Sequence, residues 1–472
     1  MANFLEGLNR CVWGVPALFL ILTVGILLSV KTKWVQLRMF PLACRTFFRE
    51  MCRQNADKET TSAYQSLCTA LAATVGTGNL AGVAGALCIG GPGAIFWMWC
   101  CGILGMVIKF AEAVLAVRYR VRDETGGFTG GPMYMIRNGL GESWAWMGSL
   151  YCFFGVAAAF GVGNATQVNA VIGGINRVIT DFGGKETNAG NLIMGILLGI
   201  AVVVLLLGGA KRIGAVAQRL VPLAAGIYLL LGIGVLLLRA KWIPDAFTAI
   251  VRGAFQPRSV TGGVLGSVMQ TLRIGVSRGV FTNEAGMGTA AIAHGASDVR
   301  HPVEQGLMGI MEVFLDTIVI CTMTALVILC SGVKIPYGTD VGIALTAEAF
   351  SAVCGNWTSV VIAGALCCFA FATILGWGLY GARCAQYLFG PGAWRYFAVI
   401  QGIIVILGAV LKTGTVWILA EIFNGLMAIP NLITLAALSS ELIRLTKDYT
   451  FINGRKPADG GTHESIHQCK PL

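Results

Sequence analysis

Two short polar stretches interrupt long apolar runs of this chain, and their residues have the chemistry to bind a charged solute. The first is Gly76–Asn79, within TALAATVGTGNLAGVAGAL, and the second is Ser277–Asn283, which Glu284 follows. Each glycine costs a helix interior about 1 kcal/mol relative to alanine, and polar groups at membrane depth cost more. Close helix packing through small residues accounts for Gly82 and Gly85, but not for the Gly-Thr-Gly-Asn run or for Glu284. Since irregular backbone at that depth is tolerated only inside protein or beside a cavity, we predict an unwound segment in each run.

Unwound segments expose peptide dipoles, which suit a zwitterion such as an amino acid. The free amides of Gly76, Thr77 and Gly78 would bind a carboxylate at the start of a half-helix, where the helix dipole contributes about 0.3–1 kcal/mol. Carbonyl groups freed near Ser277–Phe281, a stretch that includes Gly279, would accept hydrogen bonds from an ammonium group.

The composition shows which elements must position these residues. The chain has 472 residues, of which 56% are hydrophobic and only 12% are charged, against roughly a quarter in soluble domains. This excludes an ordinary soluble enzyme, a disordered chain and a fibrous repeat. The net charge of +11 comes mostly from short loops between apolar runs, so we attribute it to membrane topology and expect no nucleic-acid partner. The 15 cysteines and four histidines form no metal-ligand spacing.

About eleven apolar runs are long enough to cross a bilayer as helices. We therefore expect an all-α polytopic membrane protein. The approximate limits of the runs are 12–30, 64–89, 93–117, 145–175, 190–208, 214–238, 261–293, 304–330, 357–381, 394–411 and 414–440. The first run lacks a cationic leader beyond Arg10 and an A-x-A cleavage site, so it is interpreted as a membrane helix rather than a signal peptide.

The distribution of basic residues predicts the orientation of these spans. Most of the 34 lysines and arginines fall on one side when the N-terminus is placed outside and the C-terminus in the cytoplasm. This predicts a multi-pass protein of the inner or plasma membrane, although the loop from Arg239 to Arg258 argues the other way. The segment 33–53 mixes basic and aromatic residues and is predicted to lie along the membrane surface.

The two interrupted spans occupy matching positions in the chain. The second span is the first of five, and the seventh is the first of the next five, so the two halves enter the membrane from opposite sides. This pattern is typical of an inverted repeat with a binding site at the midplane. The predicted divisions are an extra helix at 1–31, a basic segment at 32–62, repeats at 63–240 and 241–442, and a polar, disordered cytoplasmic tail at 443–472.

Several motifs resemble the alanine or glycine:cation symporter family. They are GTGN at 76–79, GGPGAIFWMW at 90–99, KFAEAVLAVRYR at 109–120, GGPMYMI at 130–136, FTNEAGMG at 281–288, CTMTALVIL at 321–329 and FATILGWGLYG at 371–381. The resemblance implies a leucine-transporter-like fold of ten core helices in a 5+5 inverted repeat, with one extra N-terminal helix. It also implies uptake of alanine or glycine coupled to Na⁺, with no organic cofactor.

The resemblance further implies roles for individual residues. Gln167 would face the substrate, Phe281 and Trp377 would close a small pocket around it, and Asn79 and Thr373 would line that pocket. The shared sodium site of the fold would take its oxygen ligands from Ala72, Val75, Ala370 and Thr373. Thr74 and Asn79 lie where some relatives hold a second sodium ion.

Other residues leave alternatives open. Lys109 with Glu112, and Glu312 with Asp316, have the spacing of pairs within one helix. Asp316 and Glu284 favour a proton-coupled or exchange transporter of the same fold as the nearest alternative. A channel is a further alternative. A membrane-embedded enzyme is the most distant, because the glycine spacing misses GxGxxG and no strand precedes it. No GxxxxGK[ST] motif for ATP occurs, and the sequence leaves the oligomeric state open.

Overall fold

The computed structural model describes residues 15–53, 61–123, 126–181, 183–257, 267–411 and 414–454, together with Gly7, Val12 and Thr261. Within these residues the chain is helical, apart from one short antiparallel pair of strands, β1 (Val121–Arg122) and β2 (Phe128–Thr129). The predicted all-α membrane class is confirmed.

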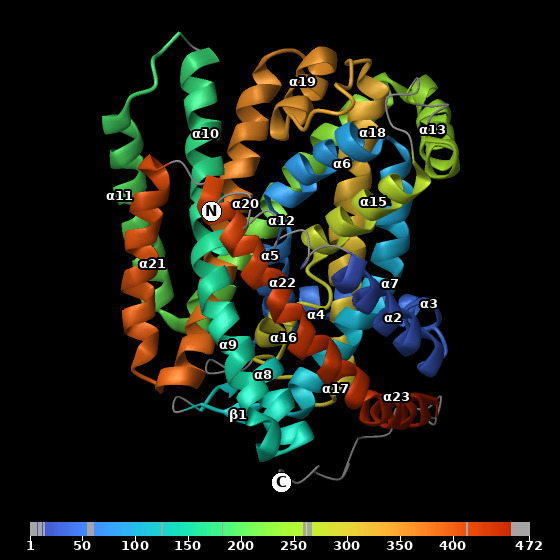
Figure 1. Cartoon of the computed structure of the whole chain (residues 1–472), viewed down its shortest axis with the longest axis vertical. Coiled ribbons are helices and arrows are strands. Elements are labelled where there is room, and N and C mark those ends of the chain that lie inside the picture. The colour runs from blue at the N-terminus through green and yellow to red at the C-terminus, as the bar shows by residue number, and fades with distance from the viewer. Residues whose placement is uncertain are drawn as a thin grey trace.

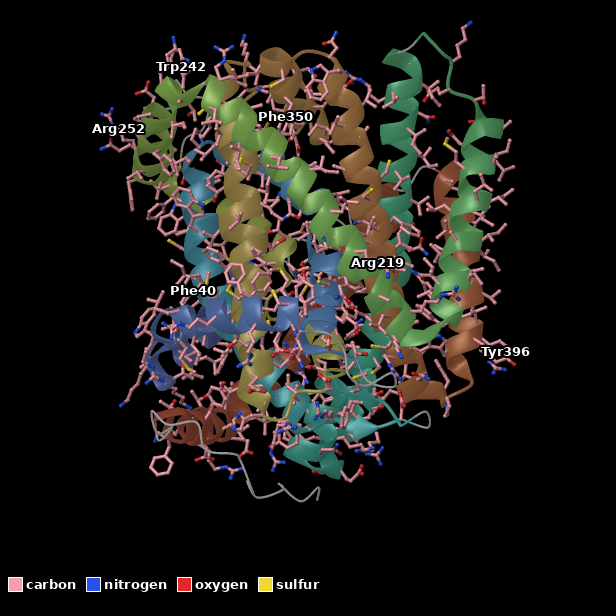
Figure 2. All side chains as sticks on the ribbon, turned by 180° about the vertical axis from the view of Figure 1, so that it is seen from behind. Phe40, Arg219, Trp242, Arg252, Phe350 and Tyr396 are labelled. Atoms are coloured by element: carbon pink, nitrogen blue, oxygen red, sulfur yellow. The ribbon has the colours of Figure 1, made fainter. Side chains whose placement is uncertain are left out.

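The first part of the chain holds one apolar helix and two surface helices, α2 (Val15–Lys31), α3 (Val35–Arg38) and α4 (Phe40–Cys52). Helix α4 has Pro41 in its first turn, where a missing N–H costs nothing. It runs across the long axis of the molecule, with Phe40 at its start (Figure 2). The described part of the predicted basic segment is thus mostly helical, from Val35 to Cys52, and its position on a membrane surface stays a prediction.

The next group of helices surrounds the first polar stretch. Its members are α5 (Ala63–Thr74), η1 (Gly78–Gly82), α6 (Val83–Gly90), α7 (Gly93–Arg118), α8 (Pro132–Met135), η2 (Ile136–Leu140), η3 (Glu142–Trp144), α9 (Ala145–Phe160), η4 (Gly161–Ala165), α10 (Thr166–Asp181), α11 (Asn188–Leu207) and α12 (Gly209–Leu238). Every residue of α5 is buried, so this helix lies inside the bundle, whereas α10 and α11 lie at its side (Figure 1).

The last group contains the second polar stretch. Its members are η5 (Ala240–Trp242), α13 (Ile243–Phe255), α15 (Val268–Asn283), α16 (Thr289–His294), α17 (Pro302–Val313), η6 (Phe314–Cys321), α18 (Thr322–Ser331), α19 (Ile343–Cys354), α20 (Trp357–Phe389), α21 (Ala393–Val410), α22 (Gly414–Ala437) and α23 (Ser439–Gly454). The sequence did not predict α13 and α19, which lie at the end of the molecule opposite α23 (Figure 1).

Each of the eleven predicted runs contains helix in the part of the chain that the structure describes, and the two runs that hold the polar stretches are interrupted, at 75–76 and at 284–288. Seven helices there are long and apolar enough to cross a membrane, and nine qualify when each of two bent pairs counts as one span. The bent pairs are α5 with η1–α6, at 53°, and α22 with α23, at 58°. The predicted tail was partly wrong, since residues up to Gly454 belong to α23, whose Leu442, Leu445 and Tyr449 are buried. Residues 455–472 lie outside the described part.

The first predicted break is confirmed. Helix α5 ends at Val75, whose ψ of 100° is extended, and helical backbone resumes at Thr77 and Gly78. The direction of the helix therefore changes where the Gly-Thr-Gly-Asn run was expected to unwind.

The second break lies later than predicted. Helix α15 continues through Ser277–Phe281 to Asn283, and the irregular segment is 284–288. Glu284, Gly286 and Gly288 have φ of 52°, 94° and 77°, which end a right-handed helix. Expecting freed carbonyl groups at Ser277–Phe281 was therefore wrong, because the polar side chains there remain compatible with a helix. For example, the Thr282 hydroxyl donates to the Gly279 carbonyl, 2.9 Å away.

Candidate functional site

The first break packs tightly against two other helices. A Cβ atom on Gly76 would lie 2.8 Å from Thr373 Oγ1 of α20, and one on Gly78 would lie 3.2 Å from Thr282 Cγ2 of α15. Only glycine at position 76 lets the irregular backbone approach the Thr373 hydroxyl without displacing it. The structure thus brings the two interrupted spans and α20 together at one point, although they are far apart in sequence.

Hydrogen bonds at this break differ from the prediction at one residue. The Gly76 amide donates to Asn79 Oδ1 at 2.9 Å, so it is not free for a substrate carboxylate. The Thr77 hydroxyl donates to Gln167 Oε1 of α10 at 3.4 Å. Asn79 itself is fully buried. An asparagine side chain can accept a hydrogen bond from a backbone amide a few residues earlier in the chain. The sequence alone did not distinguish this structural role of Asn79 from contact with a substrate.

A cavity of about 20 Å³ lies at the break, which is room for about one water molecule. Most of the predicted substrate residues line it. The lining residues are Ala73, Thr74, Gly76, Thr77, Gly78, Val162, Gln167, Phe281, Glu284, Thr373, Trp377 and Asn424. Asn79 is not among them, and neither is Gly279, which faces α7, where an added Cβ would lie 3.0 Å from Cys101 Cβ. Asn424 of α22 is a residue that the sequence analysis missed.

A much larger hollow of about 1560 Å³ shares Thr77, Gly78 and Phe281 with this cavity. It is lined by α10, α19 and α20 and so extends toward the end of the molecule that carries α19 (Figure 1). Arg278 and Asp340 line it and form an ion pair, with 3.1 Å between Nη2 and Oδ2. This larger hollow, called the vestibule below, therefore borders the cavity at the break on the side of α19.

Some of the oxygen atoms expected to bind a cation lie close to one another, between α5 and α20. The Thr373 hydroxyl lies 3.0 Å from the Ala72 carbonyl of α5 and 3.0 Å from the Phe369 carbonyl of its own helix. Hard cations take oxygen ligands of this kind. The Val75 carbonyl lies at the point where α5 ends, and Ala370 is fully buried on α20. Their roles as ligands stay predictions.

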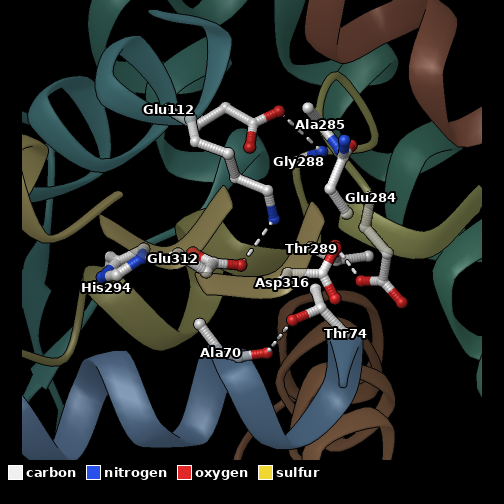
Figure 3. A network of polar contacts seen from close by, with 12 residues as sticks. Ala70, Thr74, Glu112, Glu284, Ala285, Gly288, Thr289, His294, Glu312 and Asp316 are labelled. Atoms are coloured by element: carbon white, nitrogen blue, oxygen red, sulfur yellow. Dashed lines mark hydrogen bonds and ion pairs between the residues drawn. The ribbon is translucent and has the colours of Figure 1, made fainter. Parts of the chain in front are cut away.

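The second break already holds a carboxyl group that belongs to the protein. Oε1 of Glu112 accepts hydrogen bonds from the amides of Gly286 at 3.0 Å and Gly288 at 3.1 Å, and from Asn431 Nδ2 at 2.7 Å. Figure 3 shows Glu112 turned toward this segment. Because the Glu112 carboxyl group occupies these two amides, they are not available to another acceptor.

A buried ionic network lies beside the two breaks. Lys109 Nζ is 2.9 Å from Glu312 Oε1, and His294 Nε2 is 2.9 Å from Glu312 Oε2 (Figure 3). All three side chains are fully buried. Of the alternatives that the spacing of Lys109 and Glu112 left open, a pair within one helix is not formed: Lys109 binds Glu312 of α17, and Glu112 binds the second break and Asn431. His294 lies one residue beyond the predicted apolar run 261–293, so its position in the sequence did not point to this network.

Glu284 holds one wall of the cavity in place. Its Oε2 accepts a hydrogen bond from the Thr289 hydroxyl at 2.7 Å, and its Oε1 accepts one from Trp377 Nε1 at 3.0 Å. Trp377 is 1% exposed. The carboxylate thus fixes the orientation of the large indole that faces the break.

The sequence pattern described as the sodium:alanine symporter family matches residues 1–459. The chain is 40% identical over 454 residues to the sodium/alanine symporter AgcS of Methanococcus maripaludis, covering 95% of this chain and 97% of that one. It is 36% identical to the probable sodium/glutamine symporter GlnT of Bacillus subtilis, covering 94% and 89%. Its fold is similar to the crystal structure of MhsT in complex with L-phenylalanine, with a TM-score of 0.55 at 16% identity, covering 83% of this chain and 100% of that chain. The leucine-transporter-like fold is confirmed by this similarity.

Proposed function

The chain belongs to the sodium:alanine symporter family, a family of sodium-coupled amino-acid transporters and not of enzymes, and on that premise we propose that it takes up alanine or glycine together with Na⁺ by alternating access. The observation that supports a small substrate is the pair of bulky walls, Phe281 and Trp377, at the first break, where the cavity of about 20 Å³ must widen to admit even a small amino acid. Phe281 and Trp377 would overlap with a larger side chain, and steric overlap discriminates more sharply than a missing methylene. The name of GlnT shows that relatives of similar identity differ in substrate.

The two charged groups of an amino acid have distinct candidate partners. The carboxylate would bind the Thr77 and Gly78 region with the Gln167 side chain, at the N-terminal end of the resumed helix, where the dipole is positive. The ammonium group would face the C-terminal end of α15, where Phe281 lines the cavity and the helix dipole is negative. The candidate region for the ammonium group is therefore Phe281 and the residues that follow it, instead of the whole stretch Ser277–Phe281.

Sodium would bind between α5 and α20, at the Ala72 carbonyl and the Thr373 hydroxyl, with the Val75 and Ala370 carbonyls completing the ligands. One Na⁺ crossing 100 mV releases about 2.3 kcal/mol, and a tenfold gradient adds about 1.4 kcal/mol. Together these support accumulation on the order of several hundredfold. The proposed orientation places the vestibule, with α19, on the outer side of the membrane.

The test is uptake of labelled alanine, glycine and glutamine into proteoliposomes with an inward Na⁺ gradient. Alanine or glycine uptake should require the gradient, and Thr373→Val should raise the Na⁺ concentration needed for half-maximal uptake by about tenfold or more, since it removes one ligand. Thr434→Val is the matched control, because within the residues that the structure describes the Thr434 hydroxyl bonds only to the Pro430 carbonyl of its own helix. Uptake that is unchanged when choline replaces Na⁺ would refute sodium coupling, and uptake driven by a pH gradient alone would select the proton-coupled alternative.

A further inference from the structure

The cavity at the first break has in its wall an amide group that the protein itself does not bind. Asn424 of α22 lines this cavity and is 2% exposed. Its Oδ1 atom is buried, and no group in the described part of the chain donates a hydrogen bond to it. A buried amide oxygen without a donor is costly, and nearly all such atoms in proteins have a partner. The oxygen therefore indicates that a donor from outside the chain belongs beside it.

The other polar side chains of the cavity already have partners. Gln167 accepts a hydrogen bond from Thr77 and donates one through Nε2 to the Val162 carbonyl, 3.2 Å away. Glu284 accepts hydrogen bonds through both of its carboxyl oxygens. Among the polar side chains that line the cavity, Asn424 alone forms no hydrogen bond within the residues that the structure describes. The hydroxyl and indole groups in the wall that donate to a partner belong to Thr74, Thr77, Thr373 and Trp377.

The position of α22 places Asn424 near the end of α15. Asn431, seven residues later on the same helix, donates through Nδ2 to the Gly286 carbonyl of the second break at 2.9 Å. Residues seven apart lie on the same face of an α-helix, roughly 10 Å apart along its axis. One face of α22 therefore extends from the second break to the cavity, whose wall contains both Asn424 and Glu284, the residue that follows α15.

Only one of the two charged groups of an amino acid can bind the Asn424 oxygen. A carboxylate only accepts hydrogen bonds, whereas an ammonium group has three N–H donors and no acceptor. The side chains of alanine and glycine contain no donor of their own. The Asn424 oxygen and the C-terminal end of α15 therefore suit the same ammonium group from two different helices.

We propose that Asn424 Oδ1 binds the ammonium group of the substrate and thereby makes the site selective for primary amines. The proposal rests on the proposed function, because it adds a substrate contact from α22 to the same cavity. An N-methylated amino acid has a methyl group in place of one N–H. It must turn this methyl group toward an acceptor and give up a hydrogen bond there. A site built around a hydrogen bond rejects an analogue that lacks it.

The experiment measures the dissociation constants of four probes by calorimetric titration of the full-length protein in detergent at saturating Na⁺. The probes are alanine, glycine and their N-methyl derivatives. The deciding quantity is the amine preference, defined as the dissociation constant of N-methylalanine divided by that of alanine. Because both constants come from one preparation, a lower fraction of folded protein leaves this ratio unchanged. Wild-type protein should show an amine preference of about tenfold or more, the usual effect of one lost hydrogen bond to a charged group.

Substitutions at position 424 should change both affinity and amine preference. In Asn424→Ala the affinity for alanine should fall by about tenfold to a hundredfold. The amine preference should fall with it, because the acceptor is lost and the methyl group gains room. Asn424→Asp keeps an oxygen in the same place and should retain the preference. If Asn424→Ala fails to fold, Asn424→Leu fills a similar volume without an acceptor and should lower the preference as well.

Asn176→Ala is the matched control. The Oδ1 atom of Asn176 is also buried and has no donor in the described part of the chain. Asn176 lies on α10 and lines neither the cavity nor the vestibule. Its replacement should therefore leave the affinity for alanine and the amine preference as they are in wild-type protein.

Several results would overturn the proposal. An amine preference that is the same in Asn424→Ala as in wild type, whatever the affinity, would assign Asn424 a structural role. An unchanged affinity for alanine at saturating Na⁺ together with a higher Na⁺ concentration for half-maximal binding would make the amide a sodium ligand. Equal binding of alanine and N-methylalanine by wild-type protein would remove the inference and leave the proposed function intact. Absence of sodium-dependent binding of either alanine or glycine would overturn the proposed function and this inference with it.

Discussion

Glu112 provides the sharpest test of the carboxyl group that lies at the second break. Its Oε1 accepts three hydrogen bonds, from the amides of Gly286 and Gly288 and from Asn431. Replacing Glu112 by alanine leaves three buried donors without an acceptor, at about 1–3 kcal/mol each. The loss of about 3–9 kcal/mol is comparable with the whole stability of a typical domain, about 5–15 kcal/mol. Glu112→Ala should therefore fold poorly or melt at a much lower temperature.

Glu112→Gln keeps an oxygen in the same place and should cost far less. Its new NH₂ group would replace Oε2, which is buried and has no hydrogen-bond partner. One unsatisfied donor costs about 1–3 kcal/mol, and loss of the buried charge offsets part of it. The expected order of stability is wild type, then Gln, then Ala.

The assay is thermal unfolding of the detergent-solubilised protein, followed by tryptophan fluorescence and by recovery of the monodisperse peak in size exclusion. Glu142→Ala is the control, because that glutamate is 71% exposed in its pair with Arg137 and its loss should change stability by less than about 1 kcal/mol. If Glu112→Ala were as stable as Glu112→Gln, the carboxylate would not be what holds the second break together.

Two further predictions concern the walls of the first break. Gly76→Ala should reduce uptake by about tenfold or more, because its Cβ would lie 2.8 Å from Thr373 Oγ1. Gly82→Ala is the control and should transport normally, because its Cβ would meet only Thr282 Cγ2, at 3.9 Å. Equal uptake by the two variants would contradict this packing. Trp377→Ala should admit larger amino acids such as leucine in competition assays, whereas Trp377→Phe keeps an aromatic wall and should not. Unchanged selectivity in the alanine variant would show that the indole does not limit substrate size.

Much of the fold could be predicted from the sequence, because a helix that crosses lipid requires a long continuous run of apolar residues. A backbone in hydrocarbon must satisfy its own hydrogen bonds, so long apolar runs become helices wherever they occur. The Gly-Thr-Gly-Asn run broke its helix as expected, since glycine and polar residues disfavour helical backbone locally. The helices α13 and α19, of 13 and 12 residues, left no comparable signal, because each is too short to be identified as a membrane span.

The partners of the polar residues could not be predicted in the same way. Lys109 and Glu112 have the spacing of a pair, but they bind Glu312 and the second break instead. Asn79 was expected to contact the substrate, yet it joins Gly76 to Asp316.

The amino-acid sequence alone determined that this chain is a helical membrane protein with two interrupted spans, and it placed the first interruption correctly. Tertiary structure decided where the second span breaks, which carboxylate fills that break, and which amide of the first break is already bonded. The reason is that apolar periodicity acts along the chain, whereas a buried charge or amide is satisfied by whichever donor or acceptor the packing of distant helices places within about 3 Å.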